Sequence, residues 1–163
     1  MKKLLIIILS SFFCYSTTNA DNSFETKVFE EKNIVVLKFK VPDKKFPNRD
    51  YVLAQIHFPK ILNTKFPLII HQHGSSRDGI KFEEWGGLTD EWGKRLVDVG
   101  LNRGYAVALI DAFYDRDLKP GDKLKFPHAV KIALELGKIL SKSEKIEKSK
   151  IFYTGFSYGA GQV

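Results

Sequence analysis

The sequence predicts an α/β protein in which a mostly parallel sheet carries helices on both faces. Short, continuously apolar runs such as Leu68–Ile70 and Ala106–Ile110 are typical of strands that are buried on both sides. Segments with apolar residues at helical spacing separate these runs. Alternation of strands and helices favours parallel pairing, because each helix carries the chain back across the sheet.

Five strands are expected, at Asn33–Val41, Tyr51–Phe58, Phe66–His71, Tyr105–Ile110 and Ile151–Thr154. The first two are separated by a turn-rich gap and could pair as an antiparallel edge. The other three should form the parallel part of the sheet, because a helix is expected in each interval between them.

The first expected helix begins near Thr89, a candidate N-cap, and ends before Gly104. The second is opened by Pro127 and ends near Ser141. Apolar spacing predicts that each helix buries one stripe. The predicted stripes are Leu88, Trp92, Leu96 and Val99 in the first helix, and Val130, Leu134, Gly137 and Leu140 in the second.

Residues 1–20 have the pattern of a secretory signal peptide. Two lysines precede the apolar run Leu4–Phe13, and Thr18-Asn19-Ala20 offers small residues for cleavage. The run is shorter than the roughly 20 apolar residues that span a bilayer. We therefore expect an exported protein, periplasmic or secreted, with no membrane span after cleavage; an uncleaved anchor is the alternative.

Composition argues against several other classes of protein. The 163 residues carry a formal net charge of +7, which falls to +5 once Lys2 and Lys3 are removed with the signal. The remaining lysines are dispersed and form no basic tract with interleaved aromatics, so a nucleic-acid partner is not expected. Cys14, the single cysteine, lies within the signal, so the mature chain would have no disulfide.

The segment Gly155–Gly159 has the Gly-x-Ser-x-Gly pattern of a nucleophile elbow. An apolar strand precedes it and small residues follow it, as a tight strand-to-helix turn requires. Ser157 is therefore the candidate catalytic nucleophile. In chains with this elbow the acid and the histidine that activate the serine come later, and here no Asp, Glu or His follows Ser157.

Acyl transfer also requires hydrogen-bond donors for the oxyanion. The backbone N–H of Tyr158 follows the nucleophile, and the N–H of Ser75, in the loop after an earlier strand, is the second candidate. His73, Gly74 and Asp111 are expected to shape the site, because they too fall at carboxyl ends of predicted parallel strands. Phe113 and Tyr114 could line a substrate pocket or belong to the core.

His71 and His73 would share a strand face, but no third ligand is apparent, so a metal site is not expected. A packed, hydrogen-bonded pair is the favoured role. By chemistry alone, Asp111 could be a catalytic acid and His128 a base. Neither has the chain position that this elbow uses, so Asp111 is expected to organise the following loop and His128 to lie near a helix start.

Three segments together resemble the α/β-hydrolase superfamily and, within it, the dienelactone hydrolase group: Leu68–Ser76, Gly104–Phe113 and Ile151–Gly159. The resemblance extends over about residues 50 to 163. It implies that residues 21–163 form the N-terminal portion of the domain, with the last strands and helices absent. It also implies hydrolysis of a carboxylic ester or lactone through an acyl-enzyme on Ser157, without metal or organic cofactor.

The resemblance does not place the catalytic acid and histidine in this chain. We therefore expect the chain as given to hydrolyse activated esters very slowly or not at all. A non-catalytic or degenerate binding protein that retains the front half of the fold is the alternative.

Overall fold

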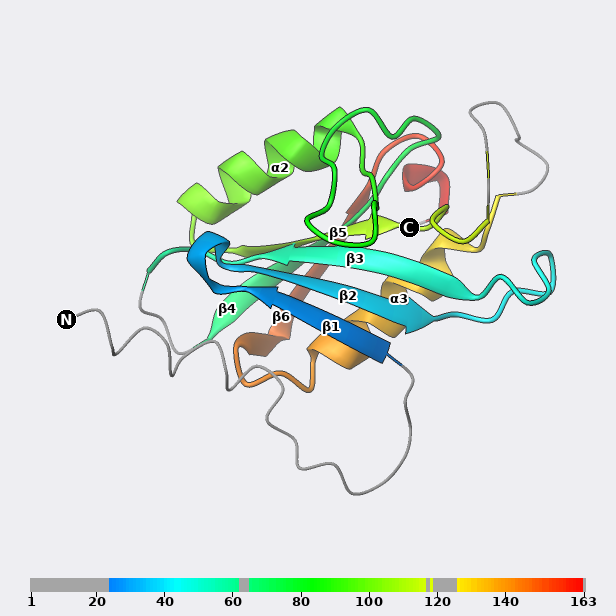
Figure 1. Cartoon of the computed structure of the whole chain (residues 1–163). Coiled ribbons are helices and arrows are strands. Elements are labelled where there is room, and N and C mark those ends of the chain that lie inside the picture. Colours follow the sequence, from blue (N-terminus) through cyan, green and yellow to red (C-terminus); the bar gives the residue numbers. More distant parts are fainter. Residues whose placement is uncertain (1–23, 62–64, 117, 119–125, 163) are drawn as a thin grey trace, which may run out of the picture.

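The computed structural model describes residues 24–61, 65–116, 118 and 126–162, and confirms the α/β class (Figure 1). These residues form one six-stranded sheet in the order β1-β2-β3-β5-β4-β6. The strands are β1 (Phe24–Phe29), β2 (Ile34–Lys40), β3 (Tyr51–His57), β4 (Phe66–Gln72), β5 (Ala106–Asp111) and β6 (Ile146–Gly155). The predicted signal peptide lies outside the described residues.

The sheet is mixed. Strands β1, β2 and β3 form an antiparallel meander, and β3 is also antiparallel to β5. Strands β5, β4 and β6 are parallel, as their helical connections predicted. The pairing of β2 with β3 is the expected antiparallel one, but β1 rather than β2 forms that edge. Strand β1 was not predicted from the sequence, because three of its six residues are polar and they interrupt the apolar pattern.

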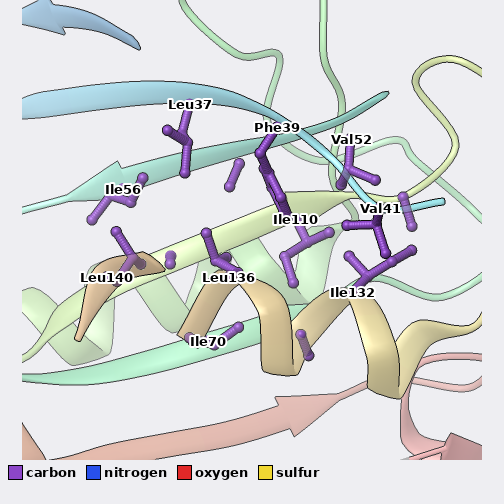
Figure 2. Packing of buried hydrophobic residues seen from close by; sticks show 14 of the residues in the cluster. Leu37, Phe39, Val41, Val52, Ile56, Ile70, Ile110, Ile132, Leu136 and Leu140 are labelled. Atoms are coloured by element: carbon purple, nitrogen blue, oxygen red, sulfur yellow. The ribbon is translucent and has the colours of Figure 1, made fainter. Parts of the chain in front are cut away.

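Helix α2 (Glu91–Asn102) covers one face of the sheet and α3 (Ala129–Leu140) covers the other (Figure 1). Successive residues of each central strand therefore enter different cores. Figure 2 shows the larger core, in which Ile132, Leu136 and Leu140 of α3 pack together with strand residues such as Ile70 and Ile110. Val97 of α2 belongs to the second core, with Val107 and Leu109.

Both predicted helix stripes were correct only in part; in the first, Leu96 does pack against the second core. Helix α2 buries Gly93, Val97 and Gly100, whereas Trp92 and Val99 are about half exposed, at 49% and 50%. A Cβ built at Gly100 would lie 2.6 Å from Cγ2 of Val107, so this helix lies too close to the sheet for a side chain there.

Helix α3 shows the same kind of shift. It buries Ile132, Ala133 and Leu136 together with the predicted Gly137 and Leu140, while Leu134 is 46% exposed. Large apolar residues were thus an incomplete guide to the buried faces. Among the described residues, no helix is both long and apolar enough to cross a bilayer.

Candidate active site

The sheet register brings the carboxyl ends of the three predicted parallel strands, β4, β5 and β6, to the same end of the sheet. Gln72, the last residue of β4, pairs with Gly155 of β6 and with Ile110 of β5. The segments that begin at His73, Asp111 and Phe156 consequently leave the sheet side by side. The convergence inferred from the sequence is present in the fold.

Ser157 lies in a tight turn between β6 and a short 3₁₀ helix, η3 (Ala160–Gln162). Its φ is +49°, in the left-handed region that non-glycine residues rarely adopt. The flanking glycines are required by close packing. A Cβ at Gly155 would lie 2.5 Å from the carbonyl carbon of Gly159, and a Cβ at Gly159 would lie 2.3 Å from the backbone oxygen of Gln72. Ser157 itself is exposed.

The loop after β4 passes directly beside this turn. A Cβ built at Gly74 would lie 3.4 Å from Cβ of Ser157 and 3.0 Å from Cδ1 of Phe156. The absence of a side chain at Gly74 therefore allows the loop to approach the serine. Among the described residues, neither the backbone N–H of Ser75 nor that of Tyr158 donates a hydrogen bond. Both amides are therefore free, within the described part of the chain, to donate to a ligand.

His73 fixes the orientation of the loop. Its Nε2 accepts a hydrogen bond from the N–H of Ala112 at 3.1 Å, so the ring proton is on Nδ1, which donates to the carbonyl of Gly74. The C=O and N–H of a trans peptide point in opposite directions, and this bond therefore sets the direction of the Ser75 N–H. Burial lowers the pKa of His73, although Asp111 opposes this, so the ring is neutral near pH 7.

Asp111 organises two loops at the same edge. Its buried carboxylate accepts from the N–H of Phe113 at 3.0 Å and from the N–H of Leu88 at 2.8 Å. Arg77, in the loop after β4, donates to both of its oxygens at 2.9 and 3.0 Å. The expected structural role is confirmed for the described start of the loop after β5.

Tyr158 anchors the elbow through its side chain. The ring is buried and its hydroxyl donates to the carbonyl of Pro127 at 2.7 Å, just before α3. Burial raises the pKa of Tyr158, so the phenol remains protonated. The ring centroids of Phe113 and Phe126 lie 5.4 and 4.7 Å from that of Tyr158.

These contacts decide between the two roles considered for Phe113. Its side chain is only 1% exposed and its ring packs edge-on against His73, with centroids 4.5 Å apart. Phe113 is therefore a core residue in this structure. Tyr114 is partly buried and packs against the second core, on the side of α2.

Asp90 was not predicted as a site residue. The structure makes it, rather than Thr89, the N-cap of α2, where its Oδ1 accepts from the N–H of Gly93 at 2.8 Å. Its Oδ2 accepts from the N–H of Gly74 at 2.7 Å, and His71 Nε2 lies 3.0 Å from Oδ1. An aspartate directly before the expected helix, three residues after Gly87, was a visible cap signal, but its bond to Gly74 depends on the tertiary fold.

None of the four histidines, all of which are described, hydrogen-bonds to Ser157. His71 pairs with Asp90 and His57 with Gln55, while both nitrogens of His73 are occupied. His71 and His73 are thus each hydrogen-bonded as expected, but to other groups rather than to one another. His128 stands at the N-cap of α3, where its backbone N–H donates to Asp43 and its carbonyl accepts from the N–H of Ile132, and its side chain makes no capping hydrogen bond.

No protein-family model and no curated protein matches the sequence. Solved structures do match the fold. They include a protein from Bacteroides fragilis that is assigned as an acetyl xylan esterase (14% identity, TM-score 0.55, covering 97% of this chain and 47% of the other). A glucuronoyl esterase from Solibacter usitatus matches with 14% identity and a TM-score of 0.52, covering 95% of this chain and 52% of the other.

A protein from Klebsiella pneumoniae assigned as a dienelactone hydrolase matches with 16% identity and a TM-score of 0.51, covering 77% of this chain and 51% of the other. The six-stranded mixed sheet therefore has the fold of the α/β-hydrolase esterases. The chain spans about half the length of these three proteins.

Proposed function

We propose that this chain carries the nucleophile and the oxyanion hole of an exported serine hydrolase that acts on carboxylic ester or lactone bonds. The observation that carries the proposal is Ser157 at φ +49° on a strand-to-helix turn, with Gly74 packed against it. Left-handed backbone at a non-glycine residue is costly and tends to occur at functional sites. Here it places an exposed serine beside two amides that have no partner among the described residues.

In the proposed reaction, Oγ of Ser157 attacks the substrate carbonyl. The amides of Ser75 and Tyr158 stabilise the oxyanion, and loss of the alcohol leaves an acyl group on Ser157. Water then hydrolyses this acyl-enzyme. Phe156 and the loop after β4 border the serine and would contact the substrate first. A small-molecule ester or lactone is the proposed partner.

We further propose that the base and the acid come from outside the described residues. The engaged nitrogens of His73 exclude it as a base in this arrangement, and the other histidines are paired with other groups or placed at a helix start. Without a positioned base, the hydroxyl of Ser157 stays protonated. This chain should then show at most the residual rate that an oxyanion hole and binding supply, about 10³–10⁴ over water.

Covalent labelling with a fluorophosphonate tests the proposal directly. Imidazole in solution would replace the missing base: it takes the Oγ proton as the O–P bond forms, and the P–F bond breaks with release of fluoride. Mass spectrometry should find the adduct on Ser157 of the native chain and none at that position in Ser157→Ala. Ser76→Ala, at a neighbouring exposed serine, is the matched control and should label normally. Absence of a Ser157 adduct, or equal labelling of exposed serines in general, would contradict the proposal.

Export is proposed from residues 1–20, with cleavage after Ala20. Mass spectrometry of the exported protein should then show an N-terminus at Asp21. Recovery of exported protein that still begins at Met1 would contradict the cleavage.

A non-catalytic binding protein on the same fold is the alternative function. It predicts no enhanced reactivity of Ser157 with or without imidazole, and no effect of Ser157→Ala on ligand affinity.

A further inference from the structure

We infer that Asp90 is a positioning residue that holds the oxyanion loop in place by linking the Gly74 amide to the start of helix α2. This inference rests on the proposed function, because it assigns a purpose to the loop that carries the Ser75 amide. No hydrogen bond joins Asp90 to Ser157, so it would act through the backbone of Gly74 rather than on the substrate.

The carboxylate of Asp90 is buried and fully used. Its side chain is 3% exposed, and three donors surround it: Gly74 N–H at 2.7 Å, Gly93 N–H at 2.8 Å and His71 Nε2 at 3.0 Å. Burial alone would raise the pKa of Asp90, but the bonds from His71, Gly74 and Gly93 outweigh it and lower the pKa. The group is therefore an anion near pH 7, and such charge-assisted bonds are the stronger kind.

The two oxygens serve different parts of the structure. Oδ1 accepts from Gly93 and His71, which belong to α2 and to β4, whereas Gly74 is the single donor to Oδ2 within the described ranges. An ordinary N-cap needs only the bond from the helix N–H, here that of Gly93. The additional bond from Gly74 ties a rigid helix to the residue that packs against Ser157.

Gly74 is thus held at both of its backbone polar groups, one in each of the two peptides that flank its Cα. Asp90 fixes the N–H of Gly74, and His73 fixes its carbonyl oxygen. Glycine has the widest choice of backbone conformations, so this position would be the least ordered in the loop without such restraints. With both in place, the Ser75 N–H has one direction relative to Ser157.

Asp90→Asn separates loop positioning from helix capping. The amide has one oxygen, which can keep the bonds to Gly93 and His71, but its NH₂ then faces the N–H of Gly74, where no hydrogen bond forms. We expect the Gly74 amide proton resonance to shift strongly upfield in the NMR spectrum while that of Gly93 stays close to its native position. Thr89→Val is the matched control, because the buried Thr89 hydroxyl has no partner among the described residues.

The functional readout is the rate of fluorophosphonate labelling of Ser157 in the presence of imidazole. Asp90→Asn should lower the limiting rate about tenfold to a hundredfold, as displacement of catalytic geometry by about 1 Å does. The half-saturating probe concentration should be unchanged, because Asp90 does not touch the probe. Thr89→Val should label at the native rate.

The results separate this inference from the proposed function. A native chain that does not label at Ser157 counts against the proposed function alone. Native labelling with an unchanged rate and an unchanged Gly74 resonance in Asp90→Asn overturns the role of Asp90. If that variant is unfolded by circular dichroism, Asp90→Ser replaces it, since a serine can cap Gly93 but is too short to reach Gly74 as well. In the native chain, Gly74 should also exchange its amide hydrogen as slowly as Gly93, and rapid exchange at Gly74 alone would overturn the inference.

Discussion

The buried histidine His57 should make the protein lose stability as the pH falls from about 6.5 to about 4. His57 lies at the end of β3 and is 8% exposed. The side-chain oxygen of Gln55 accepts from the N–H of Glu83 at 2.7 Å, so its NH₂ is the group that faces Nε2 of His57 at 3.0 Å. Nε2 must therefore accept, and the neutral ring carries its proton on Nδ1.

Burial lowers the pKa of His57 from 6.5 to about 4, although Glu83 and Asp98 favour the charged form. The difference of about 2.5 pKa units corresponds to about 3 kcal/mol, at 1.36 kcal/mol per unit. Above pH 6.5 His57 is neutral in both the folded and the unfolded chain and has no effect on pH dependence. Between pH 6.5 and 4 only the unfolded chain binds the proton, so the free energy of unfolding decreases as the pH falls.

Urea unfolding at pH 7.5, 6, 5 and 4.5 measures this decrease. His57→Gln removes the titrating group and should flatten the pH dependence. Most of the expected change of about 3 kcal/mol in the free energy of unfolding, relative to the native chain, should be present by pH 4.5. The contribution of His73, whose pKa is also lowered by burial, is present in both proteins and cancels. His128→Gln, at an exposed histidine, is the matched control. Parallel curves for the native chain and His57→Gln would refute the assigned neutral, buried state.

Three further substitutions test the elbow and the core. Gly159→Ala would place a Cβ 2.3 Å from a backbone oxygen, so it should abolish labelling of Ser157 and cost at least about 1–3 kcal/mol in urea unfolding; native-like labelling would argue against the turn geometry. Tyr158→Phe removes the bond to Pro127 and should cost about 1–2 kcal/mol by the same measurement, and an unchanged midpoint would mean that this bond contributes nothing. Leu136→Ala, at a fully buried position, should cost about 2–5 kcal/mol, and a loss below 1 kcal/mol would show that the core beneath the sheet collapses around the cavity.

The sequence by itself determined the strands of the sheet interior and the position of the elbow. A strand that is buried on both faces has a continuous apolar run, such as Leu68–Ile70, instead of alternating apolar and polar residues. Such a run can therefore be recognised as a strand without knowing which strands pair with it. The Gly155–Gly159 pattern can also be recognised locally: Gly155 is needed where the turn folds back on Gly159, although Gly159 is needed because it lies against Gln72 of β4. Both features can thus be recognised from residues close together in the chain.

Only the tertiary structure decided which face each helix buries and what holds the loop after β4. Helix α2 packs through Gly93 and Gly100 because they allow close approach to the sheet, whereas a hydrophobic pattern selects large side chains such as Trp92. Asp90 could be read as a cap from its neighbours, but its bond to Gly74 joins residues 16 positions apart. Hydrogen bonds of this kind depend on how β4 and α2 are packed, and local sequence pattern carries no information about that distance.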